Sequence, residues 1–287
     1  MGYLLRTSTV FLSGSLVVGA ASQQPPVDAV VAAAAAYVRE YQARLSSVVA
    51  DETYVQQIAS AVPIGQPIPR YRKTTGEVFF MFAPGGDEWM AVRDLAVVDG
   101  QAIKDRLKVL DELKRLPVQE VVAAFKAHNS KFNIGRTSRN FNEPTLTLRV
   151  FGADHIGRFA FQQKRVERKP DGALVVLAFA EKRGPTLIRD LTHGAVLSSG
   201  EVTVEPVSGQ IRRTLLTAVA GAIRFEMITD YVLDKRLGTW VPDRFRERYQ
   251  HGNAPTSVEA AADYEDVVCE ARYANYRRFE TTAKIIK

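Results

Sequence analysis

The amino-acid sequence predicts an α+β domain in which an antiparallel sheet is accompanied by two helical regions. Near the start, and again in residues 104–130, apolar residues recur at three- and four-residue steps, as in amphipathic helices. From residue 157 onward, apolar and polar residues alternate, and short turns separate the alternating segments. Consecutive strands joined by short turns favour antiparallel pairing, so the pattern indicates α+β rather than a parallel α/β sheet.

The composition is that of a globular protein. Of the 287 residues, 46% are hydrophobic, 24% are charged and one is cysteine, which excludes a disordered chain and a disulfide scaffold. The sequence contains no internal repeat and no long low-complexity linker, so we expect residues 23–287 to form one domain. The net charge of +6 suits contact with anionic lipid surfaces, although a solvated basic surface without a partner is the simpler interpretation.

Residues 1–22 predict a secretory signal peptide. Arg6 gives the N-terminal region its positive charge, and Thr7–Ala21 is mostly apolar. Gly19–Ser22 supplies the small residues that precede a polar segment. The apolar run is shorter than the roughly 20 residues of a spanning helix, and an uncleaved membrane anchor is the alternative. We expect cleavage within Ala20–Gln23 and export to the periplasm or the extracellular space. No later stretch is long enough to predict a membrane span.

Residues Asp28–Ala50 predict the first helix, with Asp28 as its N-cap. The alanine run at residues 32–36 has high helix propensity and gives the helix a thin flank. We expect the apolar stripe to pack against the core rather than to hold a cofactor. The residues of this stripe are Val30, Ala34, Tyr37, Val38, Tyr41, Leu45 and Val48.

A strand meander follows the first helix. Alternation predicts strands at Thr53–Ile58, Glu77–Phe82 and Trp89–Val98, with a Pro-rich loop at residues 63–69 between the first two. Asp99-Gly100 is a strong signal for a tight hairpin turn.

Helix returns in residues 104–130, where Pro117 suits a first helical turn between two apolar stripes. Residues 132–151 fit a strand or a short helix nearly equally well. The remaining chain is predicted to be strands at Arg158–Lys164, Ala173–Glu181, Gly200–Val207, Ile211–Val219, Ile223–Leu233 and Trp240–Tyr249, with one or two more in Ser257–Phe279.

No motif in the sequence demands a particular chemistry. The helical zinc-protease pattern, the nucleophile elbow, the phosphate-binding loop and zinc-type Cys/His spacings are all missing from the sequence. We therefore predict a protein that is not an enzyme, with no catalytic residue, metal or cofactor, and we assign no ligand-binding residue. A spatially assembled site that includes His193 and Asp190 is the alternative. The histidines are scattered along the chain: His128, His155, His193 and His251.

Cys269 lies in a strand-like apolar run and is predicted to be a small buried hydrophobe. Arg272 nearby leaves a reactive thiol as the alternative.

Arg244, Arg246 and Arg248 alternate along one predicted strand and therefore share a face. This face is either an anion ladder for lipid phosphates or, in the interpretation we favour, a solvated face balanced by acids on neighbouring strands.

Aromatic and basic residues are interleaved in the last predicted strand. Tyr273, Tyr276 and Phe279 are expected to pack on the core. The alternative, in which they bind single-stranded nucleic acid together with Arg277 and Arg278, disagrees with export. We predict no nucleic-acid partner.

The order of motifs in residues 196–279 resembles that of exported bacterial proteins and, more distantly, that of the LolA/LolB-like superfamily of lipoprotein-sorting carriers. A strand that ends in Glu and Pro precedes a Gly turn and a strand with Arg. A Tyr-containing strand and a Gly-x-Trp-x-Pro entry into the next strand follow. The segments that carry the resemblance are Gly200–Pro206, Ser208–Thr214, Ile228–Tyr231, Gly238–Pro242 and Ala271–Phe279.

This resemblance implies a strongly curved antiparallel half-barrel whose concave face is covered by helices. It also implies an exported, non-enzymatic carrier or sensor that binds a lipid or another hydrophobic ligand in the cell envelope. No ligand-contacting residue of the family maps onto this chain. The alternative is an exported module with a filled core that binds another protein or an envelope polymer.

Overall fold

The computed structural model describes residues 25–61, 70–82, 89–137, 139, 143–170, 172–190, 194–252 and 264–279. The predicted signal peptide, the Pro-rich loop and His193 lie outside these ranges.

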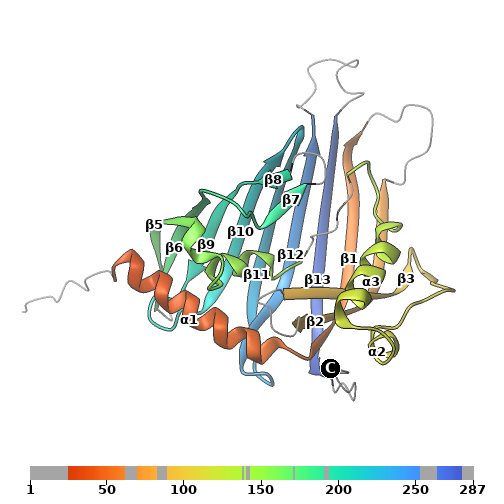
Figure 1. The fold of residues 1–287 in the computed structure, drawn as a ribbon, viewed down its shortest axis with the longest axis horizontal. Helices are drawn as coiled ribbons and strands as arrows, with labels where there is room; N and C mark the ends of the chain where they lie inside the picture. The colour runs from red at the N-terminus through yellow and green to blue at the C-terminus, as the bar shows by residue number, and fades with distance from the viewer. Residues whose placement is uncertain are drawn as a thin grey trace, which may run out of the picture.

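Eleven strands of the described residues form one open antiparallel sheet, as the alternation predicted (Figure 1). Their order across the sheet is β4-β3-β2-β1-β13-β12-β11-β10-β9-β6-β5, with β7 and β8 paired separately. The sheet is not closed, which agrees with an incomplete barrel. The strands are β1 (Val48–Ala61), β2 (Tyr71–Phe82), β3 (Trp89–Val98), β4 (Gln101–Ala102), β5 (Phe159–Lys169), β6 (Gly172–Glu181), β7 (Ile188–Asp190), β8 (Gly194–Val196), β9 (Ser198–Val204), β10 (Ile211–Ala220), β11 (Ile223–Asp234), β12 (Thr239–His251) and β13 (Glu265–Arg278).

β1 and β13, which are the first and last strands in the sequence, are neighbours within the sheet. β1 pairs with β13 from Val48↔Arg278 to Ala61↔Glu265, and β1 also pairs with β2. The hairpins β1–β4 are thereby joined to the meander β9–β13. The β3–β4 turn is the predicted one, since Asp99 and Gly100 both have positive φ angles of 49° and 82°.

Helix α1 (Val27–Leu45) is shorter than the predicted Asp28–Ala50, and its N-cap is Pro26 rather than Asp28. It ends where Ser47 adopts a positive φ of 63°. The next residues, Val48 and Val49, are β-branched and pair with Phe80 and Phe79 of β2, so tertiary pairing overrides the helical pattern there.

The main core lies between α1 and one face of the sheet, which we call the inner face. The buried α1 residues Val30, Ala34, Val38 and Leu45 belong to the same core cluster as the inner-facing side chains of the strands. In Figure 1, α1 runs across the strands from β5 toward β13.

Helices α2 (Val109–Glu112) and α3 (Val118–Ser130) belong to a second core cluster. The strand residues in that cluster include Phe79 and Val92, which alternate with Phe80 and Ala91 of the main core. Successive strand residues point to opposite faces, so the strand residues of this second cluster lie on the face opposite to the main core. We predicted that both helical regions cover one concave face, and the structure does not show this arrangement. Periodicity identifies the apolar stripe of a helix, but it does not identify the face of the sheet that the stripe contacts.

The ambiguous segment of residues 132–151 contains no strand among its described residues. It contains the 3₁₀ helix η1 (Leu146–Phe151), followed by η2 (Ile156–Arg158). The six residues of η1 include Leu148, Val150 and Phe151, which are almost fully buried in the main core. The short-helix alternative was the better one.

The later strands agree with the prediction to within a few residues. The largest difference is β5, which continues to Lys169 instead of ending at Lys164. β9 ends at Val204, because Glu205 to Gly209 form a turn against α1. The final segment forms one strand, β13, and residues 257–263 lie outside the described ranges. No helix in the described part of the chain is long and apolar enough to cross a bilayer.

Candidate ligand-binding site

One half of the inner face is apolar. Strands β6 and β9–β12 contribute aliphatic and aromatic side chains, and α1 and η1 cover them. Buried apolar surface of this kind is the main source of folding stability. The strand residues in this half include Val175, Leu177, Phe179, Val202, Val204, Ile211, Leu216, Phe225, Met227, Val241 and Phe245.

The backbone of α1 lies directly on a turn of the sheet. Gly209 has a φ of +71°, and a Cβ built there would lie 2.1 Å from the carbonyl oxygen of Ala33. Only glycine allows this close approach of two backbones. Because alanines make the flank of α1 thin, the helix sits close to the sheet.

The other half of the inner face carries ionisable groups. Arg93 on β3 donates from Nε to both carboxylate oxygens of Glu52 on β1, at 3.0 and 2.7 Å. The Arg93 and Glu52 residues are only 8% and 3% exposed. Burial lowers the pKa of the Arg93 guanidinium, but the Glu52 carboxylate together with the nearby Tyr273 and Tyr54 more than offsets this effect, so the pKa lies well above its ordinary value.

A second buried acid lies on β12. Glu247 is 2% exposed and accepts hydrogen bonds from the hydroxyls of Tyr54, at 2.8 Å, and Tyr249, at 2.5 Å. Burial raises the pKa of Glu247, and the two tyrosine hydrogen bonds and the nearby Arg93 and Arg139 oppose that rise. The carboxyl group is therefore held in place by tyrosines of β1 and β12 and is protonated more readily than a surface glutamate.

Gln56 connects these groups to the segment after α3. Its side chain donates to the carbonyl oxygen of Phe132 at 3.0 Å and accepts from the amide of Ile134 at 3.1 Å. It also accepts from the guanidinium of Arg139, whose charged carbon lies 5.4 Å from the centre of the Tyr249 ring. The polar half of the inner face is thus capped by Phe132, Ile134 and Arg139.

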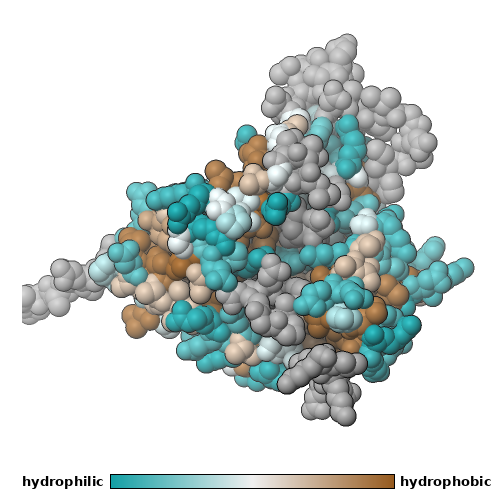
Figure 2. Space-filling model, in the orientation of Figure 1, coloured by the Kyte–Doolittle hydropathy of each residue, from teal (hydrophilic) through white to brown (hydrophobic). Residues whose placement is uncertain are grey.

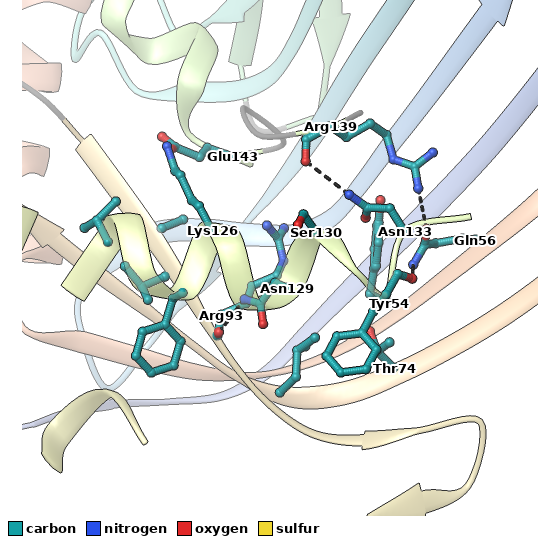
Figure 3. Close-up of a pocket in the computed structure, with 16 residues that line it drawn as sticks. Tyr54, Gln56, Thr74, Arg93, Lys126, Asn129, Ser130, Asn133, Arg139 and Glu143 are labelled. Carbon is teal, nitrogen blue, oxygen red and sulfur yellow. Dashed lines mark hydrogen bonds and ion pairs between the residues drawn. The ribbon is translucent and has the colours of Figure 1, made fainter. Parts of the chain in front are cut away.

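A small cavity lies among these polar groups, between α3 and strands β1–β3 (Figure 3). Its volume is about 50 Å³. Ligand pockets of small molecules are roughly 300–1,000 Å³, so this cavity is too small for an acyl chain. The residues around it include Tyr54, Gln56, Thr74, Arg93, Lys126, Asn129, Ser130, Asn133, Arg139 and Glu143.

A larger hollow of about 720 Å³ lies at the ends of strands β8–β12. Ala218, Phe225 and Val196 line it, and these residues also belong to the main core. Leu197 and Val219, which are 54% and 57% exposed, add apolar surface to its lining. The hollow also contains Arg224, Glu226 and Arg248. In Figure 2, apolar residues lie both beside α1 and near the strand ends around β8.

The three alternating arginines of β12 are balanced on the outer face, as the favoured interpretation predicted. Arg244 pairs with Glu270, Arg246 with Asp230 at 3.1 Å, and Arg248 with Asp266 at 2.6 Å. Because each guanidinium already has a carboxylate partner on a neighbouring strand, these groups are not an anion ladder.

Cys269 is a buried hydrophobe, as predicted. It is 1% exposed, and burial together with the nearby Glu247 raises the pKa of its thiol to about 12. A thiol of this kind is inert, which excludes the reactive-cysteine alternative.

The aromatic residues of β13 pack on the protein core. Tyr273 and Tyr276 are 6% and 4% exposed in the main cluster, and Phe279 meets Phe79 edge-to-face in the second cluster. They are therefore not an exposed stacking surface for nucleic acid.

The described residues contain no group of three or more His, Cys, Asp or Glu side chains placed to hold a metal ion. His128 lies on α3, His155 precedes η2 and His251 ends β12, so these three do not share an element.

The sequence prediction missed the buried polar half. Its signal was present in the alternation, because Glu52, Tyr54 and Gln56 share a strand face with the core residues Ala50 and Ile58. In the same way, the prediction that the β12 arginines face outward implies that Glu247 faces inward.

No family model and no curated protein sequence matches the chain. Among solved structures, the chain is similar to a domain from Vibrio parahaemolyticus provisionally described as an outer membrane lipoprotein-sorting protein. The identity is 9%, the TM-score is 0.42, and the match covers 89% of this chain and 95% of the other. A DUF1329 family protein from Desulfovibrio piger matches with 11% identity and a TM-score of 0.39, over 89% and 94% of the two chains.

A domain described as a lipoprotein-sorting protein is thus among the solved structures to which this chain is similar.

Proposed function

We propose that the protein is an exported, non-enzymatic carrier or sensor of a lipid or another hydrophobic ligand in the cell envelope, and that residues 23–287 act as one domain. The predicted signal peptide supports export to the periplasm or beyond. The absence of catalytic motifs from the sequence supports a binding role rather than catalysis.

The observation that carries the proposal is the hollow at the ends of β8–β12. It has the volume of a small-molecule pocket, and Val196, Ala218 and Phe225 connect its lining to the apolar half of the inner face. An acyl chain that enters there would meet apolar side chains first. Arg224 beside it suits an anionic headgroup.

The test is native mass spectrometry of the mature protein after incubation with vesicles of phosphatidylglycerol and phosphatidylethanolamine, followed by organic extraction. A discrete extractable adduct of a few hundred daltons supports the carrier. A mass that stays at the apo value contradicts it and favours the interaction module.

A pair of matched variants locates the site. Leu197→Asp places a charge in the lining of the hollow, whereas Val207→Asp places the same charge at an 85% exposed valine of the turn after β9. We expect L197D to lose lipid capture and V207D to retain it. Equal capture by both variants would mean that the ligand does not enter through this hollow.

A further inference from the structure

Arg139 is a buried cation with hydrogen-bonding capacity to spare. The residue is 3% exposed, and its Nη2 donates to Gln56. Its Nε and Nη1 atoms are buried and have no hydrogen-bond partner in the described part of the chain. No carboxylate among the described residues forms an ion pair with it. A guanidinium in a low-dielectric site is costly unless its charge and its N–H groups are matched.

Arg93 adds a further donor to the same cavity. Its Nε is taken by Glu52, but its buried Nη2 has no partner among the described residues. Both arginines line the cavity of about 50 Å³ beside α3 (Figure 3). Two separate chain segments, β3 and the segment after α3, therefore bring N–H donors without a hydrogen-bond partner to the same cavity.

The remaining charges around the cavity are already paired. The Nζ atom of Lys126 lies 3.3 Å from a carboxylate oxygen of Glu143, and Glu52 forms an ion pair with Arg93. Glu247 lies near Arg139 but accepts hydrogen bonds from two tyrosine hydroxyls. Among the charged residues around the cavity, Arg139 therefore differs from Arg93 and Lys126: no carboxylate of the described residues forms an ion pair with it.

The size of the cavity restricts what can match these donors. A water molecule needs about 10–15 Å³ of such volume, so the space holds about three to five atoms of that size. This is enough for the oxygen atoms of a carboxylate or a phosphate, which arginine binds with paired N–H groups. It is too little for a hydrocarbon chain.

We propose that the cavity between α3 and strands β1–β3 binds a small oxyanion, a carboxylate or phosphate group, with Arg139 as the principal donor and Arg93 as the second. The group belongs either to a free anion or to the headgroup of an amphiphile. The site lies on different strands from the apolar hollow, so it does not depend on the proposed carrier function. Asn129 and Ser130 of α3 lie where the cavity opens toward solvent.

The test is isothermal titration of the mature protein with inorganic phosphate, with palmitate and with hexadecanol. Arg139→Gln removes the principal donor and should weaken oxyanion binding by about tenfold or more, the usual effect of losing a charged hydrogen bond. Arg213→Gln removes one positive charge from the outer face, where Arg213 pairs with Asp230, and should leave binding unchanged.

A second pair of variants keeps the test valid if R139Q does not fold. Ser130 is exposed at the end of α3, so Ser130→Asp brings a negative charge to the cavity without disturbing the core. Ser130→Asn is the neutral control. We expect S130D to weaken oxyanion binding severalfold and S130N to preserve it.

The outcomes separate the two sources of the anion. Phosphate binding that depends on Arg139 supports a free-anion site. Arg139-dependent binding of palmitate but not hexadecanol supports a headgroup site. The contrary result has three parts: phosphate does not bind, palmitate and hexadecanol bind equally well, and R139Q changes neither affinity. In that case the cavity holds water only. The oxyanion proposal then falls while the carrier proposal stands.

Discussion

The two halves of the inner face differ in chemistry although the same sheet builds both. Under α1, strands β6 and β9–β11 present mostly aliphatic and aromatic side chains, and the helix covers them closely at Gly209. Beside α3, strands β1, β3 and β12 present Glu52, Arg93 and Glu247 at the same depth. Apolar contacts are non-directional, and buried charges need partners at fixed positions. The first half therefore tolerates rearrangement, and the second does not.

The largest expected effect comes from breaking the buried ion pair. Glu52→Gln leaves Arg93 charged, buried and uncompensated, and should lower the free energy of unfolding by about 3–5 kcal/mol. Urea denaturation measures this loss.

Replacing both partners provides the control. The double variant Glu52→Leu with Arg93→Met should recover most of the lost stability, because no buried charge remains unpaired. If the double variant is as unstable as E52Q, the pair contributes packing rather than electrostatics, and the two halves of the inner face are more alike than we infer.

The next largest effect tests the apolar half. Gly209→Ala adds a Cβ that would collide with the Ala33 carbonyl and should lower the free energy of unfolding by about 2–4 kcal/mol, since it adds overpacking to backbone strain. Gly238→Ala has a similar φ of +63° and no atom within 4 Å, so it should cost about 1 kcal/mol.

The same pair of glycine variants tests whether α1 shields the apolar half of the inner face from solvent. We expect the fluorescence of an added hydrophobic dye to increase with G209A and not with G238A, because only the first pushes α1 from the sheet. Equal dye binding by both variants would show that α1 does not control access to the apolar half.

A smaller effect concerns Cys269 and high pH. Its pKa of about 12 in the folded protein exceeds its ordinary value of 9.0, so the folded state holds the proton more tightly. The contribution to stability is complete below about pH 9 and is lost as the pH rises toward 12. Between pH 8 and pH 10, the wild type should lose about 1.4 kcal/mol more than Cys269→Ala. Urea unfolding at the two pH values measures the difference, and equal losses would contradict the assigned burial.

The smallest effect is expected on the outer face. Arg246→Gln removes a partly exposed ion pair with Asp230, and Asp230 keeps its second partner, Arg213. The free energy of unfolding should fall by less than about 1 kcal/mol, and less still in 0.5 M salt. A loss comparable to that of E52Q would mean that the outer pairs are as desolvated as the inner ones.

Much of the fold could be predicted from the sequence because it is a local property. Alternation identified β2, β3, β6 and β10–β12, and the Asp99-Gly100 turn was read directly from its residues. The end of α1 was wrong because pairing with β2 decides it. The strands that α3 contacts were not predicted, because periodicity does not specify a packing partner.

The candidate sites were harder to predict than the fold. Arg139 and Gln56 are 83 residues apart, and their contact exists only once β1 and the segment after α3 are in place. The hollow is built from β8–β12 together, and no single strand among them carries a motif. The local signals were polar residues at core-facing strand positions, Glu52 and Gln56 on β1 and Glu247 on β12, which a search for known motifs does not detect.

The pairing of β1 with β13 has a consequence for how the chain folds. The contact between Arg277 and Asp51 joins residues 226 positions apart, and this strand pair lies in the middle of the sheet. Closing so long a loop is slow, and contacts of this separation form late in folding. While the chain is being synthesised, β1–β3 must wait for β13 before the sheet becomes continuous. Until then the strand edges are unpaired and exposed to aggregation, so we expect refolding to be slow and sensitive to protein concentration.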